Sequence, residues 1–480
     1  MLRSRRGAIS LRTAIIAAVL TLGGVAASPR RAERVTDRLP DRLADSTFWR
    51  IVTTFSEPSG TFPSENFVSN ETEWQTVIPG VLGKVNPASA YVGVGPEQNF
   101  TYIAAFQPHI AFICDIRRQN MIEHLMYKAL IELSPDRADF LSRLWSRRRP
   151  DGLDSATTPA DLLAAYRAVK ADSLTFTLNL DAIFDRLVRA HKFTLNSEDS
   201  ATMRAVYSVF FAQGPDISYS SSSRRGGGML PQFFGQPGGV TFGGGTGSVQ
   251  IMRAGTTGTI YISNGGVGTT YHMTTDSTGK LVVTRDSAGV QVPDSTFKPG
   301  NSFPFAGGLP GAAGISFPIG GLGFATFGSL MTEDDGAGVN RGWLGGKTAY
   351  RWLRDFETRN LLVPIVGNFA GSKALRSVAQ YLKDNGAHVS AFYTSNVEQY
   401  LFQSSIEGYF YDNVAEMPSD ANSIFIRSFP NIAFGYVNPR PSRSVGPRLA
   451  QTTSSIDTVL RAYRGGMLSS YPGLAQLQDR

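Results

Sequence analysis

The chain has 480 residues, of which 42% are hydrophobic and 18% are charged, so it can build a large core and more than one structural unit. Its single cysteine, Cys114, excludes an intrachain disulfide, and its five histidines lack the spacing of metal ligands. The formal net charge of +7 falls to +3 without residues 1–27, which hold four arginines and no acid. Because no basic face is evident, we do not predict nucleic-acid binding.

Residues 1–27 have the pattern of a signal peptide or N-terminal anchor. Arginines precede the apolar run Thr13–Ala27, and Val25-Ala26-Ala27 resembles a signal-peptidase site. We therefore expect an exported protein, in the periplasm, the envelope or the medium, or one attached to the membrane through its N-terminus. Arginines in the charged linker that follows, residues 28–47, oppose translocation, so a cytoplasmic location stays open as the alternative.

Residues 48–213 are predicted to form the first part of an α/β core. Residues 55–73 lack a regular pattern and predict an ordered loop. Two short apolar runs, each followed by helical spacing, predict two strands and two helices. In chain order these are a strand at Ala90–Val94, a helix opened by Pro96, a strand at Ile110–Cys114 and a helix at Gln119–Leu133. A helical segment follows, with helices at 135–146, 159–170, 172–191 and 197–212 and caps at Ser134 and Thr158.

The composition changes sharply at Gly214. Residues 214–328 contain 27 of the 50 glycines and several short runs of β-forming residues. Those runs are Ser248–Arg253, Thr259–Ser263, Thr269–Thr274 and Leu281–Thr284. The pattern predicts an antiparallel meander inserted into the α/β chain.

Residues 329–430 predict the second part of the core, and residues 431–480 a tail with a short helix at Ile456–Arg464. The expected elements are a strand at Phe324–Met331, a helix at Lys347–Arg359, a strand at Leu361–Val366, a helix at Ser372–Asn385, a strand at His388–Tyr393, a helix at Asn396–Phe402 and a strand at Ser423–Arg427. Alternation of strand and helix predicts a parallel sheet, whose ligands lie beyond the carboxyl ends of the strands.

Two glycines and an acid follow the first two strands as they do in nucleotide-binding folds. Gly93 and Gly95 open the first helix, where missing side chains let a phosphate or carboxylate approach the backbone. Asp115 comes 20 residues after Gly95, the spacing of a ribose-binding acid. The alternative is a tight turn followed by an acid that caps the next helix.

Polar residues also follow the later strands. Asn396 and Glu398 open the helix after the strand His388–Tyr393, and a partly buried Glu398 would serve as a general base. The alternative is an acid that stabilises a helix N-terminus. Arg117 and Arg118 either hold an anionic group or form a solvated pair.

Two stretches, Tyr91–Leu130 and Asn360–Phe402, resemble a bacterial family of unknown function whose core is similar to S-adenosylmethionine-dependent methyltransferases. The resemblance covers residues 48–213 and 329–430. It implies a Rossmann-like, mostly parallel sheet that binds S-adenosylmethionine. It places Gly93 and Gly95 in the cofactor loop, Asp115 at the ribose, Asp334 or Asp335 near the adenine and Asn368 in the active site.

One departure from this resemblance concerns Glu97, which stands where the methyltransferase loop has a third glycine. A carboxylate there would crowd or repel the methionine carboxylate. Export also conflicts with a cofactor that is made in the cytosol. Two hypotheses follow. The first is a methyltransferase-like protein that binds S-adenosylmethionine or another nucleoside-like ligand. The alternative is an exported or envelope-attached, non-catalytic binding or structural protein on a degenerate methyltransferase scaffold.

Overall fold

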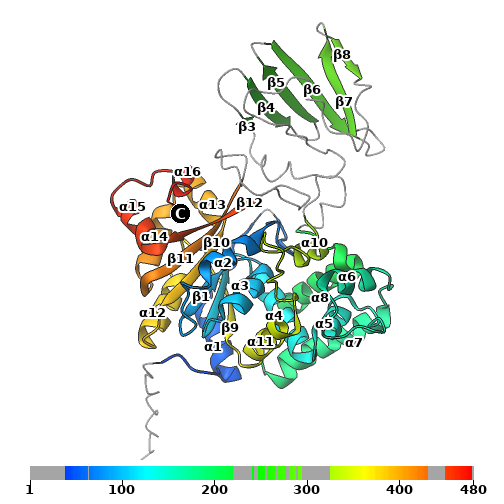
Figure 1. Ribbon diagram of the computed structural model, residues 1–480, viewed down its shortest axis with the longest axis vertical. Helices are drawn as coiled ribbons and strands as arrows, with labels where there is room; N and C mark the ends of the chain where they lie inside the picture. The colour runs from blue at the N-terminus through cyan, green and yellow to red at the C-terminus, as the bar shows by residue number, and fades with distance from the viewer. Residues whose placement is uncertain are drawn as a thin grey trace, which may run out of the picture. The chain divides into compact units, whose positions relative to one another are not determined.

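The computed structural model describes residues 38–62, 64–219, 325–430 and 449–477, with the backbone of six strands between Val240 and Pro293. The predicted leader and residues 28–37 of the predicted linker lie outside the described residues. Two separate six-stranded sheets are present (Figure 1). Among the described helices, none has the length and apolar character needed to cross a bilayer.

The core sheet has the strand order β12-β11-β10-β1-β2-β9. Its strands are β1 (Ala90–Gly93), β2 (Ile110–Asp115), β9 (Leu362–Val366), β10 (Val389–Ser395), β11 (Ser419–Pro430) and β12 (Leu449–Ser455). Five strands are parallel, and β12 runs antiparallel to β11. Counted along the chain, the order is 6-5-4-1-2-3, which is that of doubly wound nucleotide-binding sheets. The predicted Rossmann-like α/β fold is confirmed.

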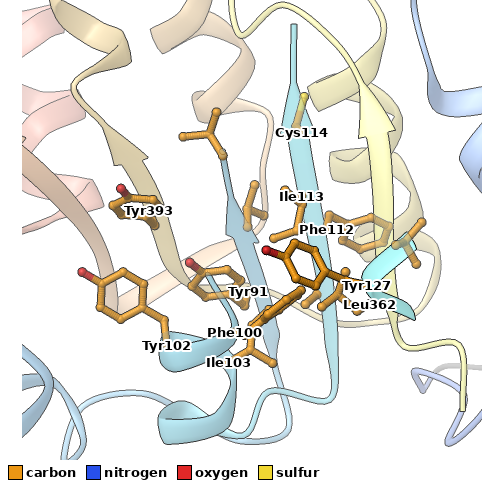
Figure 2. Packing of buried hydrophobic residues seen from close by; sticks show 14 of the residues in the cluster. Tyr91, Phe100, Tyr102, Ile103, Phe112, Ile113, Cys114, Tyr127, Leu362 and Tyr393 are labelled. Atoms are coloured by element: carbon orange, nitrogen blue, oxygen red, sulfur yellow. The ribbon is translucent and has the colours of Figure 1, made fainter. Parts of the chain in front are cut away.

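Continuous apolar sequences explain why β1, β2 and β9 occupy the middle and one side of this sheet. Every residue of these three strands is buried, as expected for parallel strands covered on both faces. Three helices pack against one another beside them: α3 (Gln98–Phe106), α4 (Arg118–Leu133) and α11 (Lys347–Thr358). Figure 2 shows part of this core, in which Phe100 of α3 meets Tyr127 of α4 with ring centroids 5.2 Å apart. Cys114 is fully buried, and burial raises the pKa of its thiol, so it is a core residue.

Three of the remaining core helices lie where helices were predicted: α12 (Ala374–Asp384), α13 (Val397–Gln403) and α15 (Ile456–Arg464). The others are α1 (Asp45–Phe55), α2 (Ile78–Val81) after the 3-10 turn η1 (Trp74–Val77), α14 (Glu407–Ala415) and α16 (Tyr471–Leu474). The predicted helix at Ile456–Arg464 is confirmed. However, β12 and α15 pack on β11, so this part of the predicted tail belongs to the core.

The helical segment is also confirmed. It consists of α5 (Arg137–Trp145), α6 (Pro159–Arg167), α7 (Ser173–Phe184) with a π-helical stretch η2 (Asp185–Ala190), α8 (Ser197–Gln213) and the short turn η3 (Gly214–Asp216). Thr158 caps α6 as predicted. The cap of α5 was predicted wrongly. Asp136, not Ser134, accepts the hydrogen bond from the N–H of Asp139, because the helix begins two residues later than expected.

The strand predicted at Phe324–Met331 is wrong, since this segment forms helix α10 (Phe327–Met331). Thr326 caps the helix and Ser329 completes a capping box. Phe327, Leu330 and Met331 are buried with helical spacing, so the apolar residues that suggested a strand face the core from one side of a helix.

The second sheet is the antiparallel meander that was predicted. Its order is β3-β4-β5-β6-β7-β8, with β3 (Val240–Phe242), β4 (Gly247–Ala254), β5 (Thr257–Asn264), β6 (Val267–Thr275), β7 (Leu281–Ser287) and β8 (Val290–Pro293). The chain leaves and re-enters the core at neighbouring points, because Ser218 and Thr326 form a β-bridge. Ile217, which precedes Ser218, and Phe327, which follows Thr326, are fully buried in the core. The inserted part is therefore shorter at both ends than residues 214–328.

Candidate functional site

Residues 57–62 and 64–73 lie along the carboxyl edge of the core sheet without a helix or strand, and we call them the strap. The strap contacts the loop after β9 first, where the carboxylate of Glu57 accepts hydrogen bonds from the N–H groups of Asn368 (3.0 Å) and Ala374 (2.9 Å). Gly60 then donates to the carbonyl of Ile116 after β2 (2.8 Å). The N–H of Ser69 donates to the Glu97 carboxyl after β1 (3.4 Å). The strap thus passes the strands in their order across the sheet.

Gly93 ends β1, one residue before the predicted end of the strand, and the space that its missing side chain leaves is filled. A Cβ at Gly93 would lie 2.1 Å from Oδ1 of Asn99 and 2.8 Å from the ring of Tyr91. The Asn99 amide donates to the carbonyl oxygens of Val94 (2.9 Å) and Pro96 (2.8 Å). The close approach at Gly93 is therefore made by the protein's own side chain. Gly95 has a φ of 81°, which glycine adopts without strain, so it shapes a turn.

Asp115 ends β2, as predicted, and its carboxylate is bound by Arg117. Oδ1 accepts from the backbone N–H (2.9 Å) and Nε (3.0 Å) of Arg117, and Oδ2 accepts from Nη2 (2.9 Å). Arg117 also donates to the carbonyl of Glu65 in the strap. Arg117 is only 6% exposed and Arg118 pairs with Asp199 (2.6 Å), so the alternative of a solvated arginine pair is wrong.

Glu97 precedes α3 and is fully buried. Burial raises the pKa of its carboxyl group to about 8, so at neutral pH the group is mostly protonated. Glu97 therefore contributes the bulk that the sequence indicated, but not the negative charge. Burial also raises the pKa of Glu123 on α4. Within the described residues, neither Glu123 oxygen has a hydrogen-bond partner.

Asn368 and Asn396 lie at the same sheet edge, after strands that are not neighbours. Asn368 follows β9, and its Oδ1 accepts from the N–H of Ala370 (2.9 Å). Asn396 follows β10, and its Oδ1 lies 3.3 Å from the Ser395 hydroxyl. Because β2 and β1 separate β9 from β10, the two positions are roughly 14 Å apart at the usual strand spacing.

Asp334 does not follow a strand, since the segment before it is helix α10. Its carboxylate accepts from the N–H of Gly336 (2.7 Å), which closes a local turn. The neighbouring Asp335 is buried and pairs with Arg341 (2.7 Å). The adenine-side role of either aspartate stays a prediction, and the structure gives both of them local partners.

Glu398 lies in the first turn of α13 and is fully buried in an ion pair with Arg427. Its carboxylate accepts from Nε (2.5 Å) and Nη2 (3.1 Å) of Arg427, from the Tyr411 hydroxyl (2.9 Å) and from the Thr394 hydroxyl (3.1 Å). These contacts join α13, α14, β10 and β11. To act as a general base, Glu398 would first have to leave Arg427.

Glu71 of the strap was not predicted, although its carboxylate accepts as many side-chain hydrogen bonds as that of Glu398. It is 1% exposed, and its carboxylate accepts from Tyr393 Oη (2.5 Å), from Gln451 Nε2 (3.1 Å) and from the hydroxyls of Ser395 and Ser428. These donors come from β10, β11 and β12. The contacts join residues 322 to 380 positions apart, so no local pattern marks them.

Other candidate sites are few among the described residues. In that part of the chain no group of three or more histidine, cysteine, aspartate or glutamate side chains has the geometry to hold a metal ion. A groove of about 800 Å³ lies between α7 and α8, lined by Phe176, Phe184, Ser200, Ala201, Arg204, Ala205 and Ser208. The predicted site residues do not line it.

One comparison with known proteins finds a match, and it covers two separate segments of the chain. A family model described as a domain of unknown function (DUF7790) matches residues 66–162 and 327–466. These two segments contain all six strands of the core sheet and leave out the inserted meander. No curated protein matches the chain. The core sheet is thus the part of this chain that is similar to a family whose function is unknown.

Proposed function

We propose that this chain is a non-catalytic binding or structural protein on a degenerate methyltransferase-like scaffold. The observation that carries the proposal is the strap, which covers the edge where a doubly wound sheet binds its ligand. A cofactor would need this edge to be open. Here each loop at the carboxyl end of β9, β2 and β1 is bonded to the strap instead.

The side chains around the expected cofactor loop and ribose site also favour this interpretation. The space beside Gly93 holds Asn99, both oxygens of Asp115 bind Arg117, and Glu97 adds bulk to the loop. A cofactor would have to displace two of these side chains and the strap. The signal-like leader fits the same proposal, because an exported protein would not meet a cofactor made in the cytosol.

A methyltransferase is the second candidate, and the strand order favours it. Gly93 and Gly95 lie at the end of β1, beside the switch point between β1 and β10 where doubly wound folds bind nucleotides, and Asp115 ends the neighbouring strand β2. In this case the strap would have to leave the edge, and Arg117 would have to release Asp115, before the cofactor could bind.

Calorimetric titration with S-adenosylmethionine and S-adenosylhomocysteine separates the two candidates. We expect no binding by the parent protein at millimolar ligand. Two matched variants are titrated beside the parent protein. Glu97→Gly removes the bulk beside the loop, and Arg117→Ala frees Asp115. Micromolar binding by the parent protein would overturn the proposal and favour the methyltransferase.

A further inference from the structure

The donors around Glu71 form a preorganised site for one carboxylate group. Tyr393 and Ser428 are fully buried, and Gln451 is 8% exposed, so water does not compete for these donors. Gln98 of α3 donates to Tyr393 Oη (2.6 Å), which directs the tyrosine proton toward Glu71. Figure 2 shows Tyr393 beside Tyr102 and Tyr91 at this end of the core, with the Tyr393 and Tyr102 ring centroids 5.2 Å apart.

The position of these donors points to ligand binding as well as to structure. Tyr393 and Ser395 belong to β10 on one side of the switch point in the strand order, and Gln98, which orients the Tyr393 hydroxyl, follows β1 on the other side. Doubly wound sheets bind their ligands at this point. The acid that fills the donor set comes from the strap, which has no helix or strand of its own, and not from the sheet.

The chemistry of the donors selects the class of ligand. The four groups that donate to Glu71 are three hydroxyls and one amide, all neutral. Neutral donors directed at two oxygens suit a planar carboxylate with a single charge. Phosphate carries more charge and is usually bound with cationic side chains.

We propose that Tyr393, Ser395, Ser428 and Gln451 form a binding site for the carboxylate of a small organic acid, with Glu71 as its intramolecular occupant. The inference rests on the proposed function, since it names the class of ligand that this edge would bind. The strap then holds the site closed, and a carboxylate that replaces Glu71 releases the strap from β10, β11 and β12.

Chemical rescue of Glu71→Ala tests the site. The variant leaves the donors without an acceptor, so its melting temperature should fall below that of the parent protein. Acetate or formate should restore most of the loss, whereas chloride at equal ionic strength should not. The isosteric Glu71→Gln, whose amide fills the same space, should show no such response. Adding Ser428→Ala to Glu71→Ala should weaken the rescue.

Several outcomes would overturn the inference. If acetate does no better than chloride, there is no carboxylate site. If inorganic phosphate restores stability as well as acetate does, the donors are not selective for carboxylates. Failure of the rescue is distinguishable from failure of the proposed function, because the S-adenosylhomocysteine titration reports on the cofactor loop and not on these donors.

If Glu71→Ala does not fold, Ser428→Ala tests the site from the donor side. Loss of one donor should speed hydrogen exchange in the strap residues 69–73, and acetate should speed it further by competing with Glu71. Exchange in Ser428→Ala that does not respond to acetate, compared with chloride, would contradict the proposal.

Discussion

Replacing Glu97 by glutamine should remove part of the stability that the protein loses as pH rises from 4.5 to about 8. In the unfolded chain this carboxyl group ionises near 4.5, whereas burial raises its pKa in the folded protein to about 8. Between these two values the folded state holds a proton that the unfolded state has lost. The free energy of unfolding therefore falls as pH rises, by about 1.4 kcal/mol per pH unit for this group.

The whole effect of Glu97 reaches at most about 5 kcal/mol by pH 8, since the shift from 4.5 to about 8 is several pH units. Glutamine keeps the volume of glutamate but does not ionise. The free energy of unfolding of Glu97→Gln should therefore rise relative to that of the parent protein as pH increases above 4.5. Below that value, where the parent carboxyl is protonated in both states, the two proteins should differ little. Burial raises the pKa of Glu123 as well, so the parent retains a further loss from that group.

Urea unfolding between pH 4 and 9, read by circular dichroism, measures this difference. Glu198→Gln, at an exposed position on α8, is the control and should follow the parent protein at every pH. Parallel profiles for Glu97→Gln and the parent would refute the reasoning. They would mean that Glu97 ionises in the folded protein as easily as in the unfolded chain.

Three other predictions concern the buried ion pair, the insertion and the leader. Arg427→Met leaves Glu398 without its cation and should lower the free energy of unfolding, measured in urea, by about 3–5 kcal/mol. Combining Arg427→Met with Glu398→Gln should recover part of this loss. A single variant as stable as the parent protein would contradict the prediction. Deletion of residues 226–321 should leave a folded core with a cooperative melting transition, because Ser218 and Thr326 already lie side by side, and an insoluble product would show that the segment belongs to the core. Fractionation with N-terminal sequencing should find cleavage near Ala27 or an uncleaved, membrane-attached form, and intact protein free in the cytosol would exclude export.

Much of the fold could be predicted because the parallel strands are continuous apolar runs. Ile110–Asp115 and Leu362–Val366 are buried on both faces, and each ends at a residue that stops the strand. By contrast, β12 was missed because Gln451, Thr452 and Ser454 are polar, although all three are buried. Gln451 donates to Glu71 of the strap, and all three belong to the strand that pairs with β11. Whether such a polar segment forms a strand depends on its pairing with a strand that is distant in the sequence, here β11, and the local pattern of apolar residues does not show that pairing.

The candidate site could be predicted only as positions along the sheet edge. The ends of β1 and β2 place Gly93 and Asp115 as expected, since strand ends are visible in the sequence. What their side chains do depends on neighbours that tertiary structure supplies. Asp115 binds an arginine two residues away, and Glu97 is protonated because it is buried. The strap matters most, and a loop without apolar periodicity gives no sign of where it lies.

Hydrogen–deuterium exchange of the strap in the parent protein tests the central claim most directly. The N–H groups of Gly60 and Ser69 donate to the loops after β2 and β1, and Glu71 is held by β10, β11 and β12. The strap on both sides of residue 63 should therefore exchange slowly, on a timescale closer to that of β1 and β2 than to that of exposed loops such as Asp151–Ser155. Strap amides that exchange as fast as those exposed loops, while the sheet stays protected, would mean that the ligand edge is open in solution and would contradict the account.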